Sequence, residues 1–290
     1  MSTIHVVSYS EMDTFRQCPH KWDLSYQQRW RPPETSRALA VGSLWHAVLE
    51  QHYLAIMAKQ AGEDAPAVGR EGEKQISTLL HDERGEQSEE QVLVEWMYAG
   101  YLDQYGLDPE WTILAVEWAG EFWLPTPRGT RSRLRLKMRL DLIVRDPNGN
   151  IWVVDHKSGR DLPRARMLEM DDQFGLYTWG LHQLGKRALG AIYSAARTQR
   201  NKTKEQPLDE RFSRTGLYRT DNELATIARE AYRTFRRAYT IKPGEAERAP
   251  DSDRCSWRCP YTEACLAGRK GVDEQQYLVA AGFTQDWTRH

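Results

Sequence analysis

The stretch between residues 134 and 159 constrains the fold more than any other part of this 290-residue chain. The continuous apolar run Ile151 to Val154 is typical of a strand buried on both faces, and Asp155 to Lys157 extends it. Residues 134–145, where apolar and polar side chains largely alternate, form a second strand candidate. Between them, Asp146-Pro-Asn-Gly149 predicts a type I turn with glycine at its left-handed end. We therefore expect an antiparallel hairpin.

The register of this hairpin decides whether its acidic residues meet. If the turn contains a glycine bulge, position 146 pairs with position 150, and counting back places Asp141 opposite Asp155. Directly opposed residues have Cβ atoms about 5 Å apart, close enough for both carboxylates to hold one cation. A slip of one residue would separate them.

Asp155 and Lys157 share one face of their strand, because side chains alternate along a strand. A lysine beside metal-binding carboxylates can act on water or on phosphate charge, so the trio with Asp141 indicates a metal-dependent phosphodiesterase. The alternative is a pair of solvated surface charges, because Asp-x-Lys spacing is frequent by chance. Other features of the chain must therefore decide.

Composition and charge set the outer bounds. A chain with 40% hydrophobic and 28% charged residues is typical of a soluble globular protein with one large or two small domains. The sequence contains no signal-peptide core and no run long enough to span a membrane, so we expect a cytoplasmic protein. The net charge of -1 hides a basic region, residues 122–204, with 17 Lys and Arg against 7 Asp and Glu.

Within this basic region, five cationic residues alternate with mainly apolar residues on the strand that carries Asp141. Because side chains alternate along a strand, the five cations are expected on the same strand face as Asp141. Such a track could lead phosphates to a metal site. The alternative is the ordinary exposed face of an antiparallel strand. The predicted DNA-binding cations are Arg131, Arg133, Arg135, Lys137 and Arg139.

The four cysteines lie near the two ends of the chain, at Cys18, Cys255, Cys259 and Cys265. In a chain without export signals, disulfides are unexpected and a metal site becomes the default interpretation. Four thiolates suit either an iron-sulfur cluster or structural zinc. Either would tie the two ends of the chain together.

Taken in order, these segments resemble the RecB-type nucleases of the PD-(D/E)XK superfamily, specifically the iron-sulfur branch with AddB-like and CRISPR-adaptation (Cas4-type) exonucleases. The resemblance covers nearly the whole chain. It is carried by residues 10–26 with Cys18-Pro, residues 42–50 with His46, Arg139-Leu-Asp141, Asp155-His-Lys157, Gln173-Phe-Gly-Leu-Tyr177 and the three closing cysteines. Two departures are Arg139, where relatives often have glycine, and three residues between Cys255 and Cys259, where many relatives have two.

The resemblance implies an α/β fold with a restriction-endonuclease-like core, a mixed central β-sheet flanked by helices, and terminal segments joined by a four-cysteine cluster. It implies that Mg2+ or Mn2+ is bound by His46, Asp141, Asp155 and the backbone carbonyl of His156. Lys157 would position or deprotonate the attacking water. Gln173 would orient the lysine or the substrate, and Tyr177 would face the cleft and contact DNA. Glu117 could contact the metal through water or bind a second ion, with Glu121 as a competing candidate.

The implied activity is a DNA exonuclease that acts on single-stranded or processed ends in recombination, repair, replication or phage DNA metabolism. It would work in the cytoplasm of a bacterium or a phage-infected cell. Its expected cofactors are Mg2+ or Mn2+ and a 4Fe-4S cluster, and the cysteine spacing leaves structural zinc open. The alternatives are a catalytically silent DNA-binding accessory subunit and an endonuclease of the same superfamily. No protein partner is indicated.

The order of the segments predicts one continuous structural domain made of four parts. These are an N-terminal helical region (1–60), a connector and helix (61–110), the nuclease core (111–200) and a C-terminal helical region (201–290). Capping boxes at Ser88-x-x-Gln91 and Thr220-x-x-Glu223 predict two helix starts. The remaining expectations are a polar connector over residues 62–87, strands at 112–118 and 192–196, a polar loop near DNA over 201–214 and a helix over 221–239.

Overall fold

The computed structural model describes residues 4–62, 65–201, 204 and 206–288, which divide into two compact units. The first unit comprises Met1–Thr35, Glu121–Lys137 and Ala228–His290, and the second comprises Ser36–Gly120 and Met138–Ile227. Three elements contribute residues to both units, namely β3 (Thr112–Pro125), β4 (Arg131–Arg145) and α9 (Asp221–Ala238). None of the helices within the described ranges has both the length and the apolar character needed to cross a membrane.

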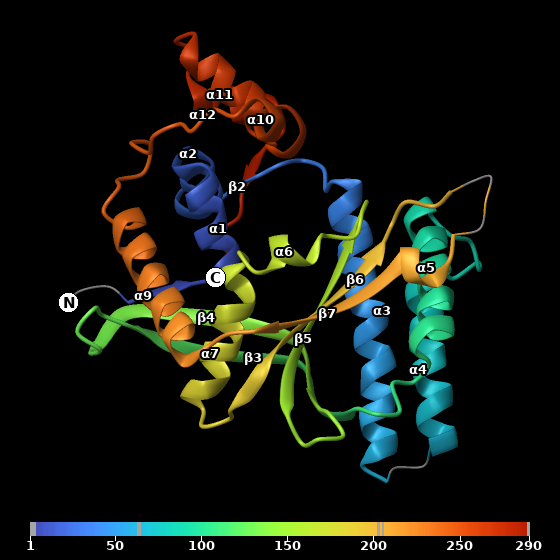
Figure 1. The fold of residues 1–290 in the computed structure, drawn as a ribbon. Coiled ribbons are helices and arrows are strands. Elements are labelled where there is room, and N and C mark those ends of the chain that lie inside the picture. The colour runs from blue at the N-terminus through green and yellow to red at the C-terminus, as the bar shows by residue number, and fades with distance from the viewer. Residues whose placement is uncertain (1–3, 63–64, 202–203, 205, 289–290) are drawn as a thin grey trace. The chain divides into compact units, whose positions relative to one another are not determined.

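The second unit is built on a mixed sheet (Figure 1). The end of β4 pairs antiparallel with β5 (Ile151–Gly159), β5 pairs parallel with β6 (Ala188–Arg197), and β6 pairs antiparallel with β7 (Phe212–Tyr218). This arrangement confirms the predicted α/β fold with a mixed central sheet.

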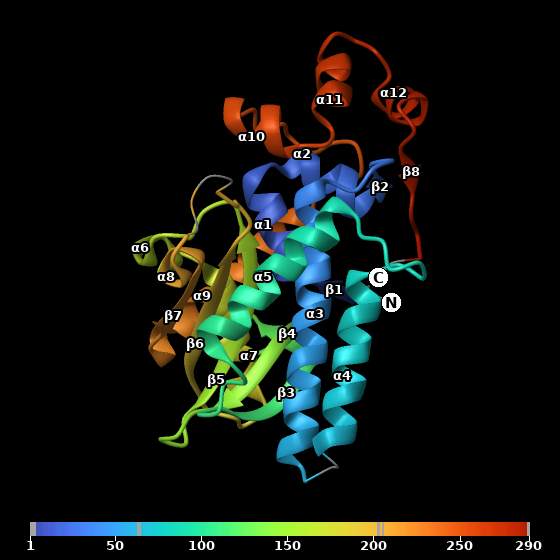
Figure 2. The ribbon, with the colours of Figure 1, turned by 90° about the vertical axis from the view of Figure 1, so that its right-hand side faces the viewer.

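Helices cover both faces of this sheet. Helix α3 (Arg37–Gln60) and helix α5 (Glu89–Tyr105) pack their apolar side chains against Leu142 and Val154, which point to one face. Helix α7 (Asp172–Gln183) packs against β5 and β6. Ile143 and Val153 alternate with the first pair and are also buried, as expected when both faces of a sheet are covered. Figure 2 shows α3, α4 and α5 gathered together.

The hairpin between β4 and β5 has the predicted turn and register. Leu142 pairs with Val154 and Arg145 with Ile151, so Asp141 is aligned with Asp155. The N–H of Asp146 donates to the carbonyl of residue 150, and the N–H of Gly149 donates to the carbonyl of Asp146. Gly149 has a φ of 85°, which only glycine adopts readily.

The first unit brings the two ends of the chain into shared cores. Leu24 and Trp30 pack with Tyr261 and Leu278, while Asp23 accepts a hydrogen bond from the N–H of Gly244 at 2.7 Å. Its strands are β1 (His5–Val7), which runs parallel to residues 134–136 of β4, and the antiparallel pair β2 (Trp30–Arg31) and β8 (Thr284–Gln285). Its other helices are α1 (Tyr9–Gln17), α2 (Pro19–Trp22), the π-helix η1 (Asp23–Gln27), α10 (Ser252–Arg258), α11 (Thr262–Arg269) and α12 (Glu274–Ala280).

Two segments differ from expectation. The predicted polar connector contains helix α4 (Ala65–Leu80), because Ile76 and Leu80 lie four residues apart and are buried against the α3 and α5 core. The predicted polar loop over 201–214 contains α8 (Leu208–Arg211) and the start of β7, which pairs with β6. Residues 202, 203 and 205 of that loop lie outside the described ranges.

A short helix, α6 (Ala165–Leu168), precedes α7. The division into four parts stays a prediction.

Both predicted capping boxes are present. The Ser88 hydroxyl accepts from the N–H of Gln91, and the Gln91 side chain accepts from the N–H of Ser88. Thr220 and Glu223 exchange the same pair of bonds at the start of α9. Two helix starts were thus readable from local sequence, since a capping box depends only on residues three positions apart.

Leu142→Ala should lower the free energy of unfolding by about 2–5 kcal/mol, because this fully buried side chain fills the core beside Asp141. The change is measured by chemical denaturation of the purified protein. The control is Leu184→Ala, where 49% of the residue is exposed and the effect should stay within about 0.5 kcal/mol. Equal losses in the two variants would contradict the assigned core.

Candidate active site and cysteine cavity

The predicted acidic pair lies at one end of the β4–β5 hairpin. The backbone N–H of His156 donates a hydrogen bond to Asp141 Oδ2 at 2.7 Å. Only 12% of the Asp141 side chain and 3% of the Asp155 side chain are exposed. Two carboxylates in so little water need compensating positive charge to ionise together. A cation bound at this end of the hairpin would therefore stabilise the two ionised carboxylates.

His46 meets the acidic pair from helix α3. Its Nδ1 atom lies 3.2 Å from Asp141 Oδ2. The position follows from the packing of the helix, because Trp45 and Leu49 lie four residues apart, are buried in the core and hold the helix against the sheet. The structure thus brings together an imidazole and a carboxylate that are 95 residues apart in the sequence.

Glu117 completes a compact set of potential metal ligands. Its carboxylate, the Asp141 carboxylate and an imidazole nitrogen of His46 lie within 4.8 Å of one another. Glu117 has a φ of 47° inside strand β3, a strained conformation for a residue other than glycine, and such strain is typical of functional sites. Its carboxylate also pairs with Arg139. The competing candidate, Glu121, lies in the first unit and pairs with Arg135 at 2.6 Å.

Lys157 and Gln173 surround Asp155. Lys157 Nζ lies 2.6 Å from Asp155 Oδ2, and Gln173 Nε2 donates to Asp155 Oδ1 at 3.4 Å. The same amide nitrogen donates to the Tyr177 hydroxyl at 2.6 Å, one helical turn further along α7. Asp155 is therefore held by both of its oxygens.

The electrostatics of the two acids differ. Burial raises the pKa of Asp155 to about 6, with a further rise from Asp141, against the opposing charge of Lys157. Burial also acts to raise the pKa of Asp141, but the hydrogen bond and charge of His46 outweigh it and hold that pKa below its usual value. The pKa of Lys157 is raised despite burial, because Asp155 stabilises the ammonium. Paired acids with separated pKa values are typical of active sites.

His156 contributes its backbone rather than its ring to this end of the hairpin. Its side chain points to the opposite face of β5, where it is buried and stacks on Tyr53 with ring centroids 5.5 Å apart. Burial lowers the pKa of His156 to about 3, so the ring is neutral. The ring is therefore turned away from the acidic pair, and the role of the His156 backbone carbonyl as a metal ligand stays a prediction.

A buried polar network under His156 was missed by the sequence analysis. Arg214 pairs with Asp108 at 2.5 Å and donates to the Tyr101 hydroxyl at 2.8 Å, while Tyr53 donates to Asp108 at 2.6 Å. The members come from α3, α5, β7 and the segment after α5, so no local pattern joins them. The positive φ of Asp108, 47°, is equally invisible in the sequence.

The predicted basic track is divided between the units and partly neutralised. Arg135 pairs with Glu121 in the first unit, and Arg139 pairs with Glu117 in the second. The guanidinium of Arg131 stacks over Trp123 at 3.7 Å. The alternation is observed from Arg133 onwards, since Leu134, Leu136, Met138 and Leu140 are all buried. The DNA-binding role stays a prediction, as it does for Arg133, Lys137 and Tyr177.

The four cysteines line one cavity of about 330 Å3 in the first unit. Cys18 caps α2, and the other three come from α10, the segment after it and α11. Burial raises the pKa of the Cys259 and Cys265 thiols. Lys21 and Arg248 line the same cavity and oppose this rise, Lys21 at Cys259 and Arg248 at Cys265, without reversing it. The structure thus gathers four thiols in one cavity that also contains two cationic side chains.

Another group of potential ligands lies beside Cys265. An imidazole nitrogen of His20 and the Glu274 carboxylate lie within 4.8 Å of its sulfur and of each other. His20 Nε2 is 2.8 Å from Glu274 Oε1, and Arg248 lies 3.3 Å from the other oxygen of that carboxylate. These contacts tie α12 to α2, the helix that follows Cys18.

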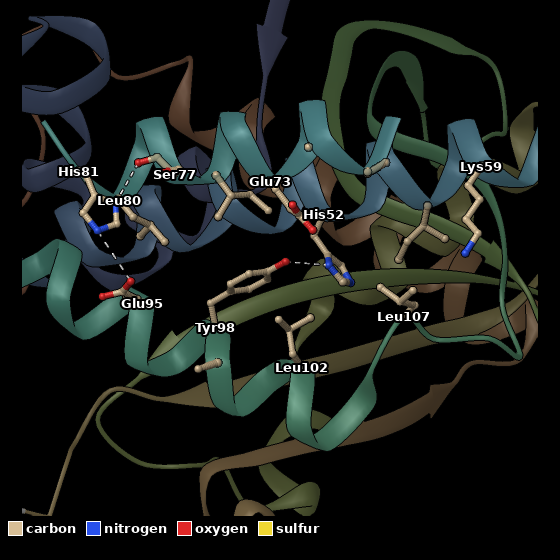
Figure 3. A pocket seen from close by; sticks show the side chains of 16 residues that line it. His52, Lys59, Glu73, Ser77, Leu80, His81, Glu95, Tyr98, Leu102 and Leu107 are labelled. Atoms are coloured by element: carbon tan, nitrogen blue, oxygen red, sulfur yellow. Dashed lines mark hydrogen bonds and ion pairs between the residues drawn. The ribbon is translucent and has the colours of Figure 1, made fainter. Parts of the chain in front are cut away.

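A separate cavity of about 610 Å3 lies between α3, α4 and α5 (Figure 3). It contains none of the predicted site residues. His52 lines this cavity, and its Nδ1 atom lies 3.1 Å from the Tyr98 hydroxyl. Burial lowers the pKa of His52 to about 4. The ring is therefore neutral at physiological pH.

The family model for the PD-(D/E)XK nuclease superfamily matches residues 6–266. The match covers most of the chain, so this chain belongs to that superfamily. No curated protein matches the sequence.

Two solved structures resemble this chain at low sequence identity. The protein SSO0001 is 14% identical with a TM-score of 0.42, covering 92% of this chain and 88% of that one. A protein from Eubacterium rectale, provisionally named an exonuclease, is 17% identical with a TM-score of 0.47, covering 84% of each chain. The assignment to the superfamily rests on the family match and not on these two structures.

His52→Gln should flatten the acid side of the stability curve. Burial lowers the pKa of His52 in the folded protein to about 4, so between pH 6.5 and 4 the unfolded protein binds a proton that the folded protein does not. The contribution of His52 to the free energy of unfolding is therefore complete above pH 6.5 and is lost as pH falls towards 4. One such proton changes the free energy of unfolding by about 1.4 kcal/mol per pH unit, and the variant should lack this slope between pH 6 and 4.5.

The matched control is His81→Gln, at the other end of the same cavity (Figure 3). Denaturant unfolding at several pH values measures both variants. The assignment fails if the wild-type and His52→Gln curves run parallel.

Proposed function

We propose that this chain is a Mg2+- or Mn2+-dependent deoxyribonuclease that removes nucleotides from DNA ends. The observation that carries the proposal is the convergence of His46, Glu117 and Asp141 beside the Asp155–Lys157 pair. Membership of a nuclease superfamily makes phosphodiester hydrolysis the chemistry to expect from these residues.

The ligand set suits a hard divalent cation. His46, Asp141, Asp155 and the His156 carbonyl would hold the ion, with Glu117 in contact directly or through water. Asp141 and Asp155 are two largely buried carboxylates side by side, and a divalent cation would neutralise their combined charge. The imidazole shifts the preference towards Mn2+ relative to an all-oxygen site. When bound, the ion supplies Lewis-acid stabilisation of charge on the scissile phosphate.

Lys157 would position the attacking water or help to deprotonate it. Its ammonium lies 2.6 Å from Asp155 Oδ2, which places it beside the proposed metal ligands. A protonated lysine can hold the attacking water or donate to a phosphate oxygen as negative charge develops there. Gln173 donates a hydrogen bond to Asp155, and Asp155 in turn pairs with Lys157. Gln173 would therefore act as a positioning residue for this pair.

Asp155→Asn and Lys157→Ala should each reduce DNA cleavage by at least about 100-fold, because the first weakens the binding of the metal ion and the second removes the cation that would stabilise charge on the phosphate. DNA affinity should be largely retained. Release of labelled nucleotides from linear single-stranded DNA with Mg2+ or Mn2+ gives the rate, and fluorescence anisotropy gives the affinity. Lys186→Ala, an exposed lysine outside the site, serves as the control.

The same assay separates the remaining alternatives. Substrates labelled at either end and covalently closed circles distinguish an exonuclease from an endonuclease of the same superfamily. DNA binding by the wild-type protein without cleavage under either metal would favour a silent accessory subunit. Full activity in both variants would overturn the catalytic assignment.

The cysteine cavity supports a second proposal, a structural 4Fe-4S cluster bound by Cys18, Cys255, Cys259 and Cys265. All four cysteines line one cavity, and four thiolates suit either an iron-sulfur cluster or structural zinc. The resemblance to the iron-sulfur branch of the superfamily favours the cluster.

Protein purified without oxygen should contain about four irons and four acid-labile sulfides per chain. Cys18→Ser should lose the cluster and destabilise the tie between the two ends of the chain, because metal binding contributes to folding. Ser256→Ala, in the same cavity, should retain the metal. Colourless anaerobic protein with one zinc per chain would refute the cluster.

The cellular role follows from these two proposals. An end-dependent nuclease of this kind would act in the cytoplasm of a bacterium or a phage-infected cell, in recombination, repair, replication or phage DNA metabolism.

A further inference from the structure

Two hollows adjoin at the carboxyl ends of β5 and β6 in the second unit. The first, of about 540 Å3, contains His46, Asp141 and Lys157. The second, of about 770 Å3, lies between α3, α5 and the residues that follow the two strands. Both are lined by Ala38 and Ser158, so the two hollows are neighbours. We call the second hollow the arginine groove.

The arginine groove has an excess of positive charge. Three arginines and one acid, Glu89, line it. Arg37 pairs with Glu89 and Glu90 at 3.1 and 3.2 Å. Arg160 and Arg200 are exposed, and within the described part of the chain neither takes part in an ion pair. These two guanidinium groups therefore remain available to an anionic ligand.

The local contacts of both arginines hold them without neutralising them. Arg160 uses only Nε, which donates to the Gln199 side chain at 3.4 Å. Arg200 lies over the Trp96 ring at 5.7 Å. An arginine oriented by an amide or an aromatic ring keeps its full charge for a phosphate.

Exposed apolar side chains stand beside the charged ones. Leu39 lines the first hollow with 61% of its surface exposed, and Val92 lines the arginine groove with 43% exposed. A duplex presents its phosphates and hides its base faces, whereas a single strand offers unstacked bases to apolar surfaces. The combination fits a single strand better than a duplex.

We infer that the arginine groove holds a single DNA strand whose reactive phosphate lies at Asp141 and Lys157, and that Arg160 and Arg200 each contact one phosphate of it. This inference rests on the proposed nuclease function and names the substrate-binding surface next to its site. The contacts are made by guanidinium groups and aliphatic side chains, so the groove binds strands without regard to base sequence.

The test uses the double variant R160Q/R200Q of the full chain. Its affinity for a fluorescein-labelled oligothymidylate is measured by anisotropy, with EDTA present to prevent cleavage, across a series of NaCl concentrations. Each lost phosphate contact on a single strand lowers the slope of log affinity against log salt by about 0.7, so the slope should fall by about 1.4. At 0.1 M salt the affinity should drop about 25-fold.

The matched control is R145Q/R187Q, which removes the same number of charges at the other end of the sheet, where Arg145 ends β4 and Arg187 directly precedes β6. Of these two arginines, Arg187 forms an ion pair with Asp221 at 3.7 Å. Both double variants change exposed side chains, so their melting temperatures should match the wild type. The single variants R160Q and R200Q should each lower the salt slope by about 0.7.

An unchanged salt slope in R160Q/R200Q overturns the inference while leaving the nuclease proposal intact. So does an equal fall in both double variants, which would indicate only general attraction. A larger loss of duplex than of single-strand affinity overturns the choice of ligand. Wild-type protein that neither binds nor cleaves DNA removes the proposed function and this inference with it.

Discussion

The burial of two carboxylates side by side on the β4–β5 hairpin is the constraint on which the rest of the second unit depends. Asp141 and Asp155 are tolerated there because His46, Lys157, Gln173 and the His156 N–H each contact one of them. Lys157 and the His156 N–H belong to β5 itself, whereas His46 and Gln173 come from helices α3 and α7, which pack on this sheet. The helices around the hairpin therefore stabilise a charge arrangement that the hairpin alone could not support.

The opposite face of β5 shows how such a site is kept rigid. His156 stacks on Tyr53, which belongs to a buried network with Asp108 and Arg214. Removing one partner of a buried ion pair leaves an uncompensated charge and is strongly destabilising, so the network tolerates little rearrangement. Since the His156 N–H also orients Asp141, the polar core on one face and the acidic pair on the other share a single strand.

Local sequence predicted the features that depend on near neighbours. The turn at residues 146–149, the alignment of Asp141 with Asp155 and the two capping boxes all follow from spacing of a few residues. The helical character of residues 65–80 was missed because those residues are polar overall, and burial of Ile76 and Leu80 against α3 and α5 stabilises the helix. The acids that pair with Arg135 and Arg139 were also missed as partners, because they come from β3.

The sequence by itself determined the superfamily, the mixed α/β class and the candidate residues. Strand alternation, turn chemistry and short motifs each depend on residues that lie close together in the sequence. Only the tertiary structure decided which of these residues meet. It brought Glu117 rather than Glu121 to Asp141, turned the His156 ring into the core, gathered four cysteines around one cavity, and opened the arginine groove beside Lys157. Contacts between distant elements depend on packing and strained backbone, which no short stretch of sequence encodes.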